Sequence, residues 1–391
     1  MNRKHYDTGT RNMLLTLTLA TGCLPCHAVS LLNKRTETLQ KKMREMRDEG
    51  IFKEYKGKQY KGKDRIWVLT VDGSDRSTML YENEVAAPLL DLFWNVTVQD
   101  GYKVTTDTPY PKKLRVMRNS ETLLFYYGIY AECIMGRYRD IREIREDTRN
   151  AGNLYYSSRE LKGITVDGGL KADLDKSNKL NTTRVNGALL SEGGNYTVYN
   201  IGRSVSKYSL SGERKLKAYL DGIMAEKERQ SVQSAVLLAR SLSLYENFIS
   251  PQNQKIQLNI GGLEGVYKHI YSLTLDTDGQ RMMQIMMRKD WKEQIYANVL
   301  TAEQRNGRTG NVECDGQKGE QYIFVFCVPD IKRFKMFLRR AEIENDRQKY
   351  TVMCFDLHKE LITKMVKGYA KVYSAKFMDY YKDTIPVEEQ I

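Results

Sequence analysis

Glycine is concentrated in one stretch of this 391-residue chain, between residues 150 and 210. Eight glycines stand there among Asn, Ser, Thr and Lys residues, and the apolar runs between them are short. Such residues interrupt helices and long strands, and a structureless loop of this length is rare inside a compact domain. We therefore expect two lobes, residues 29–150 and 211–391, joined by a Gly/Asn-rich excursion or linker over residues 151–210.

Helical spacing dominates the pattern of apolar residues outside this stretch. Leu32, Leu39, Met43 and Met46 form one narrow apolar stripe on a charged helix. Longer helices are predicted over residues 80–94, 120–149, 211–249, 280–304 and 357–382, and another over 331–341 with Asp330 as its N-cap. Short strands are predicted over residues 65–71, 102–106, 114–117, 255–260, 270–275 and 322–328. The expected fold class is therefore α+β and helix-dominated, with two lobes of long amphipathic helices and small antiparallel sheets.

Residues 1–28 have the layout of a secretory signal peptide. Arg3, Lys4 and Arg11 precede a mainly apolar run of 12 residues, which ends at Leu24 before Pro25 and small residues. This pattern predicts cleavage after Ala28 and export to the periplasm or cell envelope. Cleavage before Cys23 with attachment of lipid, as in bacterial lipoproteins, is an alternative. A third interpretation is a buried N-terminal helix of a cytosolic protein.

Charge and cysteine content limit the chemistry of the chain. The 62 Lys and Arg residues outnumber the 49 Asp and Glu residues, which gives a net charge of +13. Outside the leader only four cysteines remain, too few for a fold built on disulfides. Cys314 and Cys327 flank a turn-rich segment, so a hairpin there could join them in a disulfide.

No motif in the sequence predicts catalysis or a bound cofactor. Asp276 and Asp173 begin segments that resemble calcium loops, but each segment lacks the Gly at position 6 and the Glu at position 12. The Gly261-Gly262 turn lacks the spacing of a phosphate-binding loop. We therefore predict no catalytic residues, no cofactor and no metal site.

Basic residues crowd the start of the helix predicted over residues 331–341. The positive end of a helix dipole favours acidic residues, so this crowding calls for another explanation, such as an acidic partner. The Lys-rich connector over residues 53–63 contains two tyrosines, and we also predict that these contact a partner. The residues predicted to contact partners are Tyr55, Tyr60, Lys332, Arg333, Arg339 and Arg340.

These observations favour an exported, non-enzymatic cell-envelope protein that acts through protein–protein contacts, such as an accessory component of a bacterial secretion or conjugation apparatus. Its expected partners are other envelope proteins, and an anionic membrane surface would also suit its basic charge. One alternative is an envelope hydrolase of carbohydrate or peptide that uses Asp72, Asp75 or Glu84 near Trp67 and Trp94. The other is a basic nucleic-acid-binding protein, which would require that the chain is not exported.

Overall fold

A computed structural model describes residues 3–32, 34–55, 65–70, 108–129, 153–158, 161, 183–203, 206–226, 229–251, 254–307, 310 and 312–387. The chain divides into two compact units. The first comprises Met1–Lys179 with Asn186–Ala188, and the second comprises Leu180–Val185 with Leu189–Ile391. In the described part of the chain, no helix combines the length and the apolar character that a membrane span requires.

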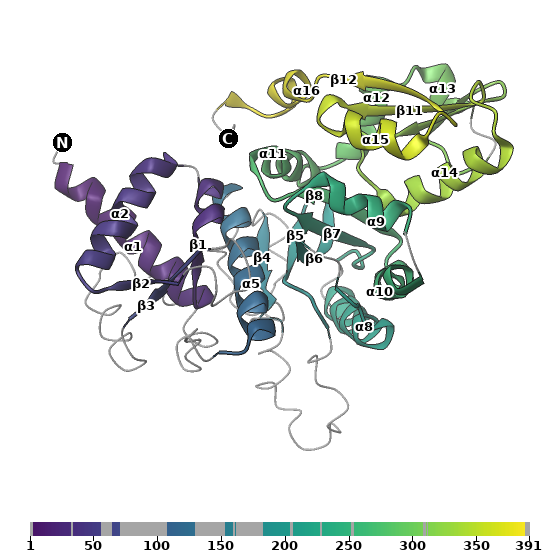
Figure 1. Ribbon diagram of the computed structural model, residues 1–391. Coiled ribbons are helices and arrows are strands. Elements are labelled where there is room, and N and C mark those ends of the chain that lie inside the picture. Colours follow the sequence, from purple (N-terminus) through teal and green to yellow (C-terminus); the bar gives the residue numbers. More distant parts are fainter. Residues whose placement is uncertain are drawn as a thin grey trace. The chain divides into compact units, whose positions relative to one another are not determined.

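Helices of the first unit pack around a small antiparallel sheet (Figure 1). Its sheet has the order β1-β3-β2, so β3 is the central strand. Strand β4 (Leu154–Ser157) also belongs to this unit. The other described elements are α1 (Arg3–Thr21), β1 (Leu24–Pro25), the 3-10 turn η1 (Cys26–Leu31), α2 (Thr36–Asp48), β2 (Phe52–Tyr55), β3 (Ile66–Leu69) and α5 (Tyr110–Ile129).

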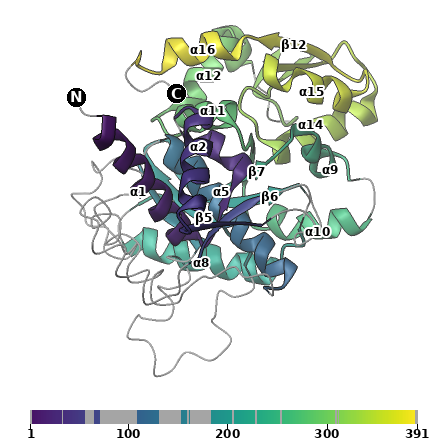
Figure 2. The same cartoon turned by 60° about the vertical axis from the view of Figure 1, so that its left-hand side comes forward.

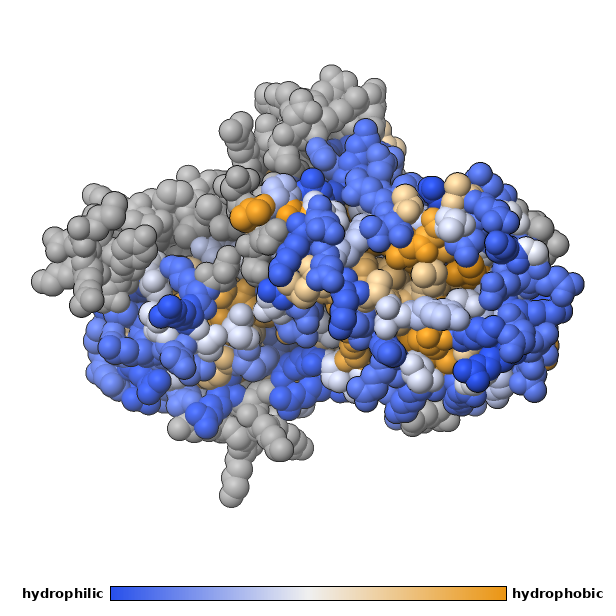
Figure 3. Space-filling view, turned by 90° about the horizontal axis from the view of Figure 1, so that it is seen from above, coloured by the Kyte–Doolittle hydropathy of each residue, from blue (hydrophilic) through white to orange (hydrophobic). Residues whose placement is uncertain are grey.

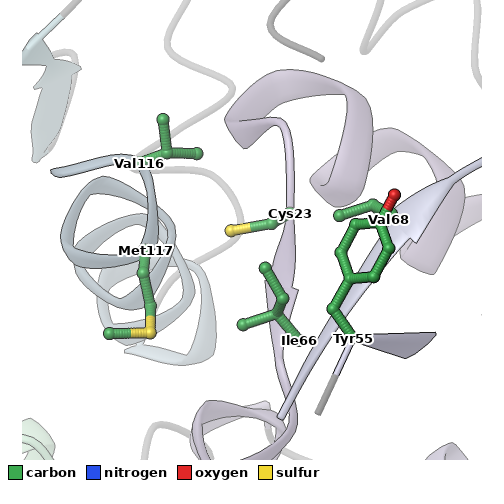
Figure 4. Close-up of a cluster of buried hydrophobic side chains, with 6 residues drawn as sticks. All are labelled: Cys23, Tyr55, Ile66, Val68, Val116 and Met117. Carbon is green, nitrogen blue, oxygen red and sulfur yellow. The ribbon is translucent and has the colours of Figure 1, made fainter. Parts of the chain in front are cut away.

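The core of the first unit joins the sheet to α5. Buried side chains from β2, β3 and α5, together with Cys23 just before β1, form one cluster, which Figure 4 shows in close-up. Its members are Cys23, Tyr55, Ile66, Val68, Val116 and Met117. On α2, Leu39, Met43 and Met46 are all buried, which confirms the predicted apolar stripe.

Parallel strands alternate with helices in the first half of the second unit. Strands β6, β7 and β8 are parallel neighbours in one sheet. Helix α8 connects β6 to β7, and α10 precedes β8. The elements are β5 (Gly187–Ser191), β6 (Gly194–Gly202), α8 (Leu210–Glu226), β7 (Ser234–Ala239), η8 (Leu242–Tyr245), α9 (Glu246–Ile249), α10 (Gln254–Glu264), β8 (His269–Thr274) and α11 (Thr277–Met286).

A second sheet of order β12-β11-β10-β9 follows in the same unit. Strands β10, β11 and β12 are parallel, and only β9 runs antiparallel to its neighbour. Helix α14 connects β10 to β11 and lies beside α9 (Figures 1 and 2). The elements are α12 (Trp291–Val299), α13 (Ala302–Asn306), β9 (Gly316–Lys318), β10 (Gln321–Val325), α14 (Ile331–Glu344), β11 (Tyr350–Phe355), η9 (Asp356–His358), α15 (Lys359–Val366), β12 (Lys371–Ala375) and α16 (Phe377–Thr384).

The predicted fold class of helical lobes with small antiparallel sheets is wrong, because the second unit contains two sets of parallel strands, β6, β7 and β8 in one sheet and β10, β11 and β12 in another. Strand β7 shows why the pattern misled. Its residues Ala235 to Leu238 are fully buried on both faces, so they form an unbroken apolar run without the alternation of a half-exposed strand. Such a run fits equally well inside a predicted helix.

Several other predicted elements also change type. The helix predicted over residues 211–249 contains β7, and the helix predicted over 357–382 contains β12. The strand predicted over residues 255–260 is part of helix α10, and it leaves Leu258 largely exposed. The helix over 331–341 is confirmed, and the Asp330 carboxylate caps it by accepting a hydrogen bond from the Arg333 backbone N–H.

Candidate functional site

Helix α14 carries four of the residues predicted to contact partners, and Asp330 fixes the position of its first turn. The side chain of Asp330 is only 1% exposed. One oxygen, Oδ1, accepts hydrogen bonds from the Arg333 backbone N–H at 3.2 Å and from the Ile270 backbone N–H at 3.3 Å. The other, Oδ2, lies 2.7 Å from His269 Nδ1. Asp330 thus caps α14 and ties its first turn to the start of strand β8.

An aromatic ring and a lysine lie beside the His269–Asp330 pair. The His269 ring stacks on Tyr271 at 5.9 Å between centroids, and the Lys292 ammonium lies 5.2 Å from the centre of the Tyr271 ring. Burial lowers the pKa of Lys292 from its usual value, because the charged form loses solvation. An imidazole oriented by a carboxylate is the pair used in general-base catalysis, but here Asp330 also caps a helix and binds a strand. These combined contacts make the pair a structural clasp.

Arg333 is bound within the chain. Its guanidinium donates to Glu313 at 2.6 Å and to Asp315 at 2.8 Å, and it lies over the Phe324 ring. Burial is the largest single effect and opposes its charge, but Asp315, Tyr296 and Glu313 together outweigh burial and raise the pKa of Arg333 above its usual value. Asp315 is itself buried, so this pair stabilises the turn before β9 and β10.

The two lysines of the same helical turn are also bound within the chain. Lys332 Nζ donates to the carbonyl oxygens of Glu264 and Tyr267 at 2.7 and 2.6 Å, at the end of α10. Lys335 Nζ lies 2.9 Å from a carboxylate oxygen of Glu264. The basic residues at the positive end of α14 are therefore explained by acceptors on neighbouring elements.

The later turns of α14 carry the remaining two predicted contact residues on the solvent-exposed face of the helix. Arg339 and Arg340 are exposed there, and Arg340 pairs with Glu344. Met336 is 46% exposed and Ile343 is 69% exposed. Their spacing of 3, 4 and 7 residues places all four on one face, which we call the outer stripe. Figure 3 shows one face of the molecule, on which orange, hydrophobic surface lies in patches within a largely hydrophilic surface.

The remaining predicted site residues lie elsewhere. Tyr55 is 8% exposed in the core of the first unit, so it does not present its ring to a partner. Tyr60 and the carboxylates considered for a hydrolase, Asp72, Asp75 and Glu84, lie outside the described residues. Cys314 and Cys327 are both buried, and no disulfide joins them. Within the described ranges, no cluster of three or more His, Cys, Asp or Glu side chains is placed to hold a metal ion.

Comparison with known proteins finds no matching family model, no matching curated protein and no matching solved structure. The assignment of function therefore depends on the residues themselves. The sequence signalled the basic residues of α14 but not their partners, because Glu264, Glu313 and Asp315 are brought to the helix only by the fold. The exposed apolar pair was also missed, although its spacing of seven residues could have indicated it.

Proposed function

We propose that this protein acts by binding another protein, and that the outer stripe of α14 is a contact surface. The observation that carries the proposal is the combination on one helix face of two exposed apolar side chains, Met336 and Ile343, with Arg339 and Arg340 between them. Met and Arg are enriched in the centres of protein interfaces. Binding becomes more favourable when a partner covers solvent-exposed apolar side chains and removes them from water.

The chemistry of the stripe indicates an acidic partner with apolar side chains beside its carboxylates. Arg340 is partly neutralised by Glu344, which flanks the stripe, whereas no contact with an acid is recorded for Arg339 in the described structure. A carboxylate on the partner would supply a bidentate acceptor for Arg339. Apolar groups on the partner would cover Met336 and Ile343.

The anchoring of α14 supports this proposal. Lys332, Arg333 and Asp330 bind the first turn of the helix to α10, β8 and the turn before β9. A contact surface on a rigid element loses little conformational entropy on binding. The basic residues that sequence alone assigned to partner contact thus divide along the helix into an anchoring set in its first turn and an exposed set in its later turns.

Affinity measurement with matched variants tests the proposal. We expect Arg339→Glu combined with Ile343→Asp to weaken binding of the partner at least tenfold, about 1.4 kcal/mol. Leu258→Asp on α10 is the control, because Leu258 is equally exposed at 66% but lies outside the stripe. Unchanged affinity of the double variant contradicts the proposal. Loss of binding to phosphatidylglycerol vesicles or to duplex DNA in the same variant would assign the stripe to those ligands instead.

Export, the lipoprotein alternative and an accessory role in secretion or conjugation remain predictions from the sequence, as does the absence of enzymatic activity. The hydrolase and the nucleic-acid-binding protein remain the competing hypotheses.

A further inference from the structure

The leader-like segment, residues 3–31, packs into the first unit as α1, β1 and η1. Leu14, Leu15 and Leu17 of its apolar run are at most 6% exposed, and so are Cys23 and Leu24. Thr18 and Thr21 donate their hydroxyl hydrogens to carbonyl oxygens one turn earlier in α1. The threonines that weaken the apolar run of a signal peptide are therefore satisfied inside a folded helix.

Strand β1 completes the sheet of the first unit. Leu24 and Pro25 pair with Trp67 and Ile66 of β3, and the Cys26 N–H donates to the Arg65 carbonyl at 2.9 Å. Because β3 lies between β1 and β2, removal of β1 would leave one side of the central strand without its neighbour.

The contacts of residues 23 and 27 with α5 bury polar groups. The Ser120 hydroxyl donates to the Cys23 carbonyl at 2.7 Å, and His27 Nε2 lies 2.9 Å from Glu121 Oε1. The Glu121 side chain is only 1% exposed. Cleavage after Ala28 would remove the imidazole, a partner of this buried carboxylate.

Cys23, the residue that a lipoprotein would modify, is fully buried among the cluster of Figure 4. Its sulfur points into the space between β3 and α5, where Ile66 and Met117 lie. A diacylglyceryl group on this sulfur has no room in that core. Arg11, counted as part of a basic leader, forms an ion pair with Glu49 at 2.6 Å.

We infer that residues 3–31 stay attached to the protein as a structural part of the first unit, and that they are neither removed by cleavage after Ala28 nor anchored through a lipid on Cys23. The inference rests on contacts inside the first unit and is independent of the proposed role of α14.

Mass spectrometry of the intact full-length protein, produced in bacterial cells that contain signal peptidases, is the first test. The expected mass includes residues 3–28. A chain that begins at Val29, or at a lipid-modified Cys23, overturns the inference.

Two measurements on the full chain test the packing without truncation. In a Cys26→Ser background, we expect a maleimide to label Cys23 at least tenfold more slowly in the native protein than in urea. We also expect His27→Gln to lower the urea midpoint of the first unit, whereas Gln40→Ala, at an exposed position of α2, leaves it unchanged. Equal labelling of Cys23 in both states, or equal midpoints for the two variants, would show that the segment is not packed.

Discussion

Replacing His358 is expected to remove a large part of the acid sensitivity of the second unit. His358 ends the turn η9 and is buried, and its ring meets Phe326 edge to face at 5.3 Å. Its Nδ1 atom has no hydrogen-bond partner in the described structure. Burial lowers the pKa of His358 from 6.5 to about 3, because the imidazolium form would lose its hydration without gaining a partner.

The sign and size of the effect follow from these two pKa values. Between pH 6.5 and about 3 the unfolded chain binds a proton at His358 that the folded chain does not, so the free energy of unfolding falls as the pH falls. Above pH 6.5 His358 is neutral in both the folded and the unfolded chain, so this loss of stability is absent. At pH 5 the loss is 1.5 pH units at 1.36 kcal/mol each, or about 2 kcal/mol.

Native-state hydrogen exchange of the β11 amides at pH 7 and pH 5 measures this free energy within the second unit. The variants are His358→Phe, which replaces the ring by an apolar one, and His358→Gln, which keeps a polar group. Both should lose about 2 kcal/mol less than the wild type between these pH values, although the Gln variant starts from a lower stability. If both variants keep the wild-type loss, His358 is not the titrating group and the argument from burial is refuted.

Two buried carboxylates give further predictions. Asp330→Ala should destabilise the second unit by about 2 kcal/mol, since it removes a helix cap and the clasp to β8. Asp330→Asn keeps a capping acceptor and should lower the free energy of unfolding by less. Urea unfolding compares the two variants, and equal losses would contradict the clasp. Glu213 accepts hydrogen bonds from the Thr183 hydroxyl, the Arg184 N–H and the Tyr199 hydroxyl at 2.6, 3.0 and 2.7 Å. Glu213→Ala should therefore lower the free energy of unfolding by about 2–4 kcal/mol. Glu360→Ala, at an exposed position, should cause no measurable change. If Glu213→Ala costs less than Asp330→Asn, the three donors find other acceptors.

The sequence predicted well those elements whose apolar residues mark one face. The stripe of α2 and the capped helix α14 have a buried and an exposed side, so their periodicity is visible. Strand β7 has no exposed side, and α10 has the alternation Ile256, Leu258, Ile260 that fits a strand equally well. Of these three residues only Ile260 is fully buried in the fold, because α10 packs against α8 and α9.

The candidate site was predictable in composition but not in arrangement. The crowding of basic residues at the start of α14 was interpreted as contact with a partner, because the helix dipole disfavours them, but Lys332 and Arg333 bind acceptors within the chain. The acceptors of Lys332 and Arg333 lie between 18 and 68 residues away along the chain, a separation that no local pattern reveals. Only the fold separates the anchoring residues from Arg339 and Arg340.

Site-specific photo-crosslinking from position 343, in the cells that produce the protein, tests the central claim most directly. A photoreactive amino acid in place of Ile343 should give one discrete crosslinked protein, and the same amino acid in place of Leu258 should not. The crosslink should disappear when Arg339→Glu is added, since the partner's carboxylates would then be repelled. No crosslink at position 343, the same products from both positions, or crosslinks only to lipid or nucleic acid would contradict the assignment of the outer stripe as a protein contact.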